Sequence, residues 1–221
     1  MDINVSFAIP TVVHYIEKTI PVVVQSLLSN NVQPEQIHVF INSSDRNTSE
    51  VIDGITYHHH IGLSYFEWLS PKLIIERNLQ SQWWFLLHDT VQFGSQFEVR
   101  FDEFMQTNEK RIVKLTPVHS NSIGMLHQDI FSDHRQFFID KFNDIDRFDD
   151  LIERKRWCIQ SENSYLRLED FSYFQKEEEI YRPHRMSPYE VPRVEEYFYG
   201  VDMTKYKKNN RGYAEVRDVD L

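Results

Sequence analysis

Apolar runs alternate with a segment of helical periodicity at the start of the chain. Residues 5–10 and 37–41 are short, β-branched runs of the kind found in strands. Residues 15–30, between them, place apolar side chains at helical spacing. Pro21 interrupts this segment, so we expect either a loose first turn before a helix that begins near Pro21, or a kink. The order strand, helix, strand predicts two parallel strands whose carboxyl ends share one edge of a sheet, where open α/β sheets bind ligands.

A continuous apolar run predicts the most deeply buried strand. Residues 83–87 read Trp-Trp-Phe-Leu-Leu without alternation, which is typical of a strand covered on both faces, and the run ends in His88-Asp89-Thr90. Further elements are expected as strands at 55–59, 111–118 and 124–126 and as helices at 65–78 (interrupted by Pro71), 131–142 and 144–156. The pattern predicts an α/β fold, a three-layer sandwich with a mainly parallel central sheet, over residues 1–181.

The character of the chain changes after residue 181. Pro183, Pro188 and Pro192 punctuate a segment that ends in a lysine-rich stretch at 205–208. We therefore expect residues 182–221 to form an irregular C-terminal arm. The lysines suit a solvated tail, with a charge clamp on a diphosphate as the alternative.

Composition narrows the class of protein. The 221 residues carry 24 Lys and Arg against 34 Asp and Glu, a formal net charge of -10, which argues against a partner such as duplex nucleic acid or an anionic membrane surface. No apolar run approaches the roughly 18 residues of a membrane span. Cys158 is the single cysteine, so no internal disulfide is possible and a cytoplasmic location is expected. A homo-oligomer is possible.

Residues 5–157 resemble the GT-A glycosyltransferases, particularly family 2-like members of the nucleotide-diphosphosugar transferase superfamily. The best stretch, residues 5–45, looks like the family's opening strand, long helix and second strand, and it closes on Ser43-Ser44-Asp45. In the family this edge cradles the nucleotide of a sugar donor. The positions that the resemblance implies for nucleotide binding are Pro10, Thr11, Asn42, Ser44 and Asp45.

A second stretch, residues 83–97, is similar to the family's strand and acidic motif. The motif usually carries two carboxylates that hold a divalent cation, Mn²⁺ or Mg²⁺, against the diphosphate of the donor. Here His88-Asp89-Thr90 supplies one carboxylate, so the resemblance implies Asp89 as a metal ligand, with the His88 imidazole beside it at the cofactor site and His184 as a candidate helper. His60 belongs to a run of three histidines that we interpret as a strand end, with a place near the sugar donor as the alternative. The alternatives are a histidine at a strand end for His88 and a turn or capping residue for Asp89.

A third stretch, residues 124–157, looks like the acceptor region of the family. Asp149 and Asp150 resemble its acidic pair at the start of a helix, where one carboxylate removes the proton of the acceptor hydroxyl, and Asp129 is a further candidate base. An ordinary solvated helix explains the same acidic run equally well.

The resemblance implies a glycosyltransferase that moves a hexose from a nucleotide-sugar donor to a hydroxyl of a saccharide or another acceptor, with metal binding. It also leads us to expect that the arm closes over the donor. Two alternatives come from other classes: a non-catalytic binding or assembly module on the same fold, and a nucleotidyltransferase or hydrolase that uses the same edge of the sheet.

Overall fold

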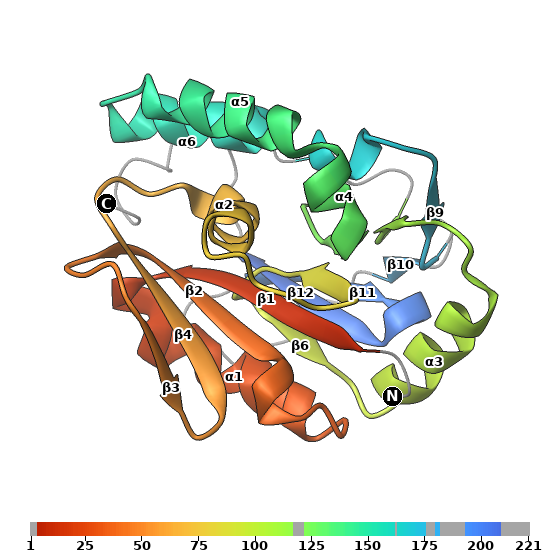
Figure 1. Cartoon of the computed structure of the whole chain (residues 1–221). Coiled ribbons are helices and arrows are strands. Elements are labelled where there is room, and N and C mark those ends of the chain that lie inside the picture. The colour runs from red at the N-terminus through yellow and green to blue at the C-terminus, as the bar shows by residue number, and fades with distance from the viewer. Residues whose placement is uncertain (1–3, 117–121, 162, 176–179, 182–192, 209–221) are drawn as a thin grey trace.

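Two β-sheets organise the chain in a computed structural model that describes residues 4–116, 122–161, 163–175, 180–181 and 193–208. The larger sheet runs in the order β3 (Ser49–Ile52), β4 (Ile55–Ile61), β2 (Ile37–Ser44), β1 (Val5–Val12), β5 (Trp83–Leu86), β8 (Gly124–His127), β7 (Ile112–Lys114), β9 (Phe171–Tyr173). The smaller sheet runs in the order β10 (Ile180–Tyr181), β11 (Arg193–Phe198), β12 (Met203–Lys208), β6 (Val91–Phe93) (Figure 1).

The larger sheet is mixed, with a parallel centre. Strand β1 is parallel to β2 and to β5, and β2 is parallel to β4. The pairs β3–β4, β5–β8 and β7–β8 are antiparallel, while β7–β9 is parallel. The expected α/β class with a largely parallel sheet is confirmed at this level.

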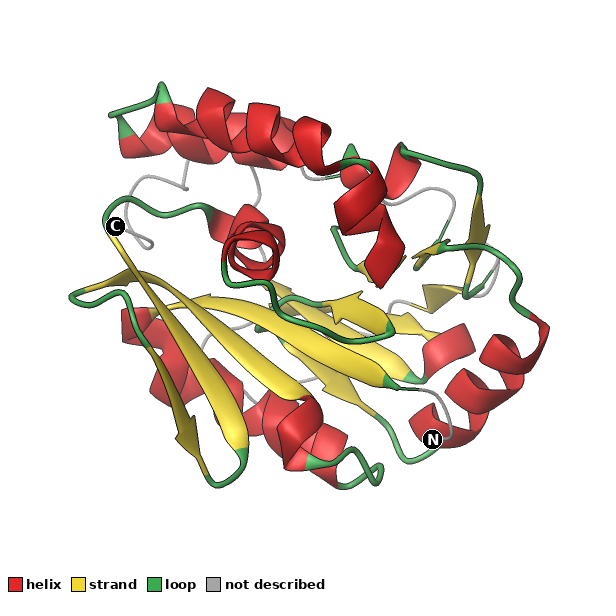
Figure 2. Cartoon of the chain, in the orientation of Figure 1, coloured by secondary structure: helices red, strands yellow, loops and turns green. Residues whose placement is uncertain are grey.

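Helices cover both faces of the larger sheet (Figure 2). The helices are α1 (Ile16–Leu28), α2 (Leu69–Glu76), α3 (Phe97–Thr107), α4 (Gln128–Asp133), α5 (Arg135–Asp146) and α6 (Leu151–Ser161), and the 3₁₀ turns are η1 (Val13–Tyr15), η2 (Pro34–Gln36), η3 (Phe66–Trp68), η4 (Tyr165–Arg167) and η6 (Tyr199–Val201). One face packs on α1, α3 and the smaller sheet, and the other face packs on α2, α4, α5 and α6.

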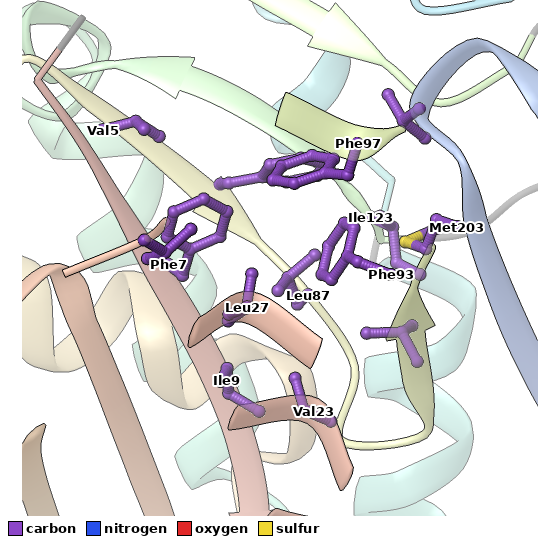
Figure 3. Close-up of a cluster of buried hydrophobic side chains, with 14 of the residues drawn as sticks. Val5, Phe7, Ile9, Val23, Leu27, Leu87, Phe93, Phe97, Ile123 and Met203 are labelled. Atoms are coloured by element: carbon purple, nitrogen blue, oxygen red, sulfur yellow. The ribbon is translucent and has the colours of Figure 1, made fainter. Parts of the chain in front are cut away.

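Side chains of the central strands alternate between these two cores. Phe7 and Phe85 point into the core under α1 and α3, where their rings are 5.9 Å apart. Figure 3 shows this core, with Phe7, Phe93 and Leu27 converging from a strand of each sheet and from α1. Trp84, one residue before Phe85, is fully buried in the opposite core. The expectation that residues 83–87 form a strand covered on both faces is therefore confirmed.

The two prolines of the expected helices have different effects. Helix α1 begins at Ile16 and continues through Pro21, so the expectation of a start near Pro21 is wrong. Burial of Ile20, Val23 and Leu27 on one helix face outweighs the backbone hydrogen bond that the proline removes. Pro71 lies in the first turn of α2, where a backbone amide has no partner within the helix, so it costs little.

The C-terminal segment is more regular than the sequence suggested. Strands β11 and β12 form an antiparallel pair over residues 193–208, and β12 also pairs with β6. The irregular arm is therefore wrong for 193–208, because an alternating apolar pattern there supplies Phe198 and Met203, both fully buried, to the core. The rest of 182–221 lies outside the described residues.

None of the helices in the described part of the chain combines the length and the apolar composition needed to cross a bilayer.

Candidate functional site

Asp89 is fixed at the carboxyl edge of the parallel strands. It lies in the loop after β5, where its Oδ2 accepts a hydrogen bond from the Thr11 hydroxyl at 2.7 Å and one from the Thr19 hydroxyl at 3.2 Å. Thr11 stands near the end of β1, and Thr19 belongs to the first turns of α1. Strand β1 and helix α1 thus hold in place a carboxylate that lies 78 and 70 residues further along the chain. The sequence predicted both Asp89 and Thr11, and the structure brings them together.

Asn42, in β2, connects the turn η3 to the end of β1. Its side-chain amide donates to the Thr11 carbonyl at 3.2 Å and to the Phe66 carbonyl at 3.3 Å, and its Oδ1 accepts from the Tyr65 amide at 2.8 Å. The side chain is buried, so its polar atoms are committed to the backbone. Asn42 therefore positions η3 beside β1 and does not present its amide to a ligand.

Glu67 belongs to η3 and completes a group of charges around Asp89. Its Oε2 atom is buried and has no hydrogen-bond partner among the described residues. Burial raises the pKa of Glu67 most, and the Asp89 carboxylate adds to the rise, while the Glu67 backbone amide and the ammonium groups of Lys205 and Lys155 oppose it. The charges of Lys205, Asp89 and Lys155 all act on the Glu67 carboxyl group, so we treat these four side chains as one cluster.

Lys205 enters the cluster from the smaller sheet. In the register of β12, it lies opposite Val91 of β6 and opposite Glu196 of β11. The adjacent Tyr206 amide donates to the Thr90 carbonyl at 2.9 Å, which places this part of β12 directly beside the Asp89 loop. The Lys205 side chain is only 5% exposed, so the interpretation of a solvated tail is wrong for this lysine. Its strand alternation points it inward, on the same side as Met203.

We call Glu67, Asp89, Lys155 and Lys205 the acidic–lysine cluster. The cluster contains two carboxylates and two ammonium groups. It lies near the carboxyl ends of β1, β2 and β5, which is the edge at which open α/β sheets bind ligands. Lys155 reaches the cluster from α6, with its Nζ 5.8 Å from the centre of the Phe66 ring. Chemically, such a site can hold a polyanion through the ammonium groups, and a cation through the carboxylates.

His88 points to a different neighbour. Its Nε2 lies 2.6 Å from the Ser122 hydroxyl, and the Ser122 carbonyl accepts a hydrogen bond from the Tyr165 hydroxyl at 3.0 Å. This contact fits the alternative of a histidine that secures the end of a strand.

The other residues predicted to bind the nucleotide differ in how exposed their side chains are. Pro10 is buried inside β1, opposite Phe40 of β2, so its side chain is not at the edge. Ser44 is also buried, with its hydroxyl 3.0 Å from His59 Nδ1. Asp45 alone of these is exposed, and it remains available to a ligand.

His60 lies near the end of β4 and packs against Tyr65. Its ring packs edge-to-face on Tyr65, with centroids 5.1 Å apart, and its Nδ1 is buried without a hydrogen-bond partner among the described residues. Burial lowers the pKa of His60, and the positive charges of Lys72 and Arg77 lower it further. The neighbours of His60 are therefore Tyr65 and the charged residues Lys72 and Arg77 of α2 and its C-terminal end.

The three expected bases are not brought together. Asp150 accepts hydrogen bonds from the amides of Ile152 and Glu153, both at 2.9 Å, and so caps the start of α6. Asp149 is exposed next to it. Asp129 lies at the wrong edge of the sheet, because β8 runs antiparallel to β5 and ends at His127, opposite Trp83 at the start of β5. Asp129 is therefore excluded from a site at Asp89.

The expected metal site is incomplete in the part of the chain that the structure covers. Within the described ranges, no three His, Cys, Asp or Glu side chains converge as they would around a metal ion. His184, the expected helper of Asp89, lies outside the described residues.

Sequence reasoning missed two members of the cluster, Glu67 and Lys155. Glu67 stands between Phe66 and Trp68 in an apolar run, and a lone charge in such a run is a signal that its carboxylate is buried for a reason. Lys155 lies in a charged helical segment that carries no such signal. Lys205 belongs to the lysine-rich stretch for which a charge clamp on a diphosphate was the alternative to a solvated tail.

Comparison with known proteins adds no assignment. No family model matches the chain, and no significant relative was found among the curated proteins.

Proposed function

We propose that the chain is a nucleotide-sugar-dependent glycosyltransferase of the GT-A type. It moves a hexose from a nucleoside diphosphate to a hydroxyl of a saccharide or another acceptor, with a divalent cation near Asp89. The observation that carries the proposal is Asp89 itself, placed directly after the central strand β5 and held by the Thr11 hydroxyl at the ligand-binding edge of the sheet.

The acidic–lysine cluster supports recognition of a diphosphate. Lys205 and Lys155 supply positive charge beside Glu67, where phosphate oxygens would lie. The Glu67 Oε2 atom, which has no hydrogen-bond partner among the described residues, fits the presence of a cation in the complex. A bound divalent cation neutralises charge on the departing nucleoside diphosphate.

The transfer step needs a base but no redox partner. The bond between the anomeric carbon and the diphosphate oxygen breaks, and its electron pair leaves on the nucleoside diphosphate. The new bond forms to the acceptor oxygen, whose proton passes to a carboxylate. Asp149 stays in the proposal as that base, because Asp150 is engaged as a helix cap and Asp129 lies at the other edge of the sheet.

A calorimetric titration tests the function. Uridine or guanosine diphosphate should bind the wild-type chain more tightly with Mn²⁺ than with a chelator. Asp89→Asn should lose about tenfold or more of the affinity in Mn²⁺, equivalent to about 1.4 kcal/mol. The matched control is Asp129→Asn, which removes one carboxylate at the opposite edge of the sheet and should bind as wild type does. Equal binding by wild type and Asp89→Asn, with and without Mn²⁺, would contradict the proposal.

A non-catalytic nucleotide-binding module is the second candidate. The capping role of Asp150 favours it, because a carboxylate committed to two backbone amides is a poor base. Release of nucleoside diphosphate from a panel of uridine- and guanosine-diphosphate hexoses separates the two. A transferase releases it faster when a hydroxyl acceptor is added, a hydrolase releases it without one, and a binding module does not release it.

A further inference from the structure

We propose that Glu67 is the second carboxylate of the divalent-cation site and that it replaces the second acidic residue missing after β5. The proposal rests on the proposed function, because the cation would bind together with the diphosphate. It makes Glu67, from η3, and Asp89, from the loop after β5, joint ligands of one ion.

The first argument is the enclosure of Glu67. Its Oε2 atom is buried without a hydrogen-bond partner among the described residues. Leaving a buried acceptor unsatisfied costs about 1–3 kcal/mol, and more where the group is charged. A chain that retains such an atom beside a second carboxylate has a place for a positive ligand. The positive charges of Lys205 and Lys155 act on this carboxylate, but no donor among the described residues makes a hydrogen bond to Oε2.

The second argument is the way in which η3 is held. The Asn42 amide joins the Phe66 carbonyl to the Thr11 carbonyl, and the Thr11 hydroxyl in turn holds Asp89. The backbone next to Glu67 and the Asp89 carboxylate are therefore both held to Thr11, near the end of β1. Phe66 also adopts a positive φ of 50°, which a non-glycine residue rarely does, and this turn delivers Glu67 to the cluster.

The third argument concerns charge. A diphosphate beside Glu67 and Asp89 brings negative charge close to two carboxylates, and like charges at short range repel, so a divalent cation between them stabilises the complex. Mg²⁺ and similar ions are commonly bound by one or two carboxylates together with substrate phosphates. Two carboxylates therefore suffice once the diphosphate is present, and this agrees with the lack of a three-ligand group among the described residues. Lys205 and Lys155 add positive charge beside Glu67, which favours a bound diphosphate.

The arrangement predicts that metal and nucleotide bind together. Mn²⁺ alone should bind weakly, and Mn²⁺ with uridine diphosphate should bind tightly. Electron paramagnetic resonance measures bound Mn²⁺ directly and does not depend on catalysis. Glu67→Gln should lose about tenfold or more of the Mn²⁺ affinity in the presence of uridine diphosphate. In a chelator it should bind uridine diphosphate at least as tightly as wild type does, because one charge that repels the diphosphate is gone.

The control for this variant is Glu103→Gln, which removes the same charge from an exposed position on α3. It should leave Mn²⁺ binding unchanged. Wild-type Mn²⁺ affinity in Glu67→Gln would overturn the inference while leaving the proposed function intact. A wild-type chain that shows no metal-dependent binding of uridine or guanosine diphosphate would instead overturn the proposed function, and the inference with it.

A second measurement needs no variant. When Fe²⁺ with ascorbate and peroxide replaces Mn²⁺ in the nucleotide complex, the radicals that form cut the backbone close to the ion. We expect cuts both near Glu67 and near Asp89. Cutting near Asp89 alone would overturn the shared site, whatever the folding behaviour of Glu67→Gln.

Discussion

The hydroxyl of Thr11 shows how one buried group can decide the geometry of the candidate site. Thr11→Val keeps the shape of the side chain and removes the donor to Asp89 Oδ2. A hydrogen bond to a charged acceptor contributes about 1.5–3 kcal/mol, so we expect the free energy of unfolding to fall by about the lower of these values, since the Thr19 hydroxyl still holds Asp89. Affinity for uridine diphosphate should fall as well, because Asp89 is less well fixed. Urea unfolding and calorimetry measure the two effects.

Thr19→Val is the control for this prediction. Its hydroxyl is farther from Asp89, at 3.2 Å, and also donates to the Tyr15 carbonyl at 3.0 Å. A smaller loss of affinity is expected than for Thr11→Val. If Thr11→Val keeps wild-type stability and affinity, the contact with Asp89 has no role in the site.

At the same scale, the sequence revealed only part of the cluster. Asp89 could be predicted because it directly follows the most apolar run of the chain. Glu67 carried only the signal of a lone charge in an apolar run, and its place beside Asp89 depends on the hydrogen bond from Asn42 to the Phe66 carbonyl, between residues 24 apart in the sequence. For Lys205, the lysine-rich stretch left a solvated tail and a charge clamp as alternatives, and only the pairing of β12 shows that this lysine is buried.

The hairpin of β11 and β12 is an integral part of the fold at the scale of elements. The Tyr197 hydroxyl and the backbone amide of Gln96 both donate to the Asp202 carboxylate. The Arg100 guanidinium stacks on the Tyr199 ring. These contacts fix the hairpin to α3. The expected closure of an arm over the donor therefore does not apply to residues 193–208.

Met203→Ala tests this role of the hairpin. Met203 is fully buried and lies opposite Phe93 in the register of β12 and β6. Its truncation should lower the free energy of unfolding by about 2–5 kcal/mol, because a cavity remains in the core. Urea unfolding gives the value, and Thr204→Ala, at the neighbouring half-buried position, should cost much less. Equal costs for the two variants would mean that the hairpin does not pack as a core element.

Elements with a long apolar signal were predictable, and elements defined by pairing were not. Strands β1, β2 and β5 could be placed because each is an apolar run, and β4 could be placed from the β-branched and aromatic residues at its start, Ile55, Thr56 and Tyr57. Strand β3 was missed, since its Val51 and Ile52 are exposed at the sheet edge. The direction of β8 carries no sequence signature, and this alone put Asp129 at the wrong edge.

At the scale of the whole molecule, a core on each face of the sheet leaves little room for charge between the layers. On the α2 face, His38 and His58 occupy neighbouring strands, with His38 Nδ1 at 3.0 Å from His58 Nε2 and their rings stacked at 5.3 Å. Trp84 and Phe40 enclose the pair. Protonating both imidazoles would place two positive charges in contact within this enclosure.

Acid should therefore unfold the chain through this pair. Burial lowers the pKa of His38 to about 4, and burial together with the charges of His38, Arg77 and His59 lowers that of His58 to about 3. In the unfolded chain both histidines titrate near 6.5. Between that value and about pH 4, the unfolded state binds more protons than the folded state, so stability is present above pH 6.5 and is lost as the pH falls. Each histidine adds up to about 1.4 kcal/mol per pH unit to this slope.

His38→Gln isolates the contribution of the pair. Glutamine can still hydrogen-bond to His58 but does not titrate. Because the substitution also removes the positive charge of a protonated His38, His58 becomes easier to protonate. We expect the free energy of unfolding, measured in urea at several pH values from 7.5 to 4.5, to decline less steeply than in wild type. His14→Gln is the matched control, because His14 is exposed on η1 and should leave the slope unchanged. The carboxylates that also lose their charge in acid are common to all three proteins and cancel in the comparison. A slope in His38→Gln equal to that of wild type would show that the acid sensitivity of the fold arises elsewhere.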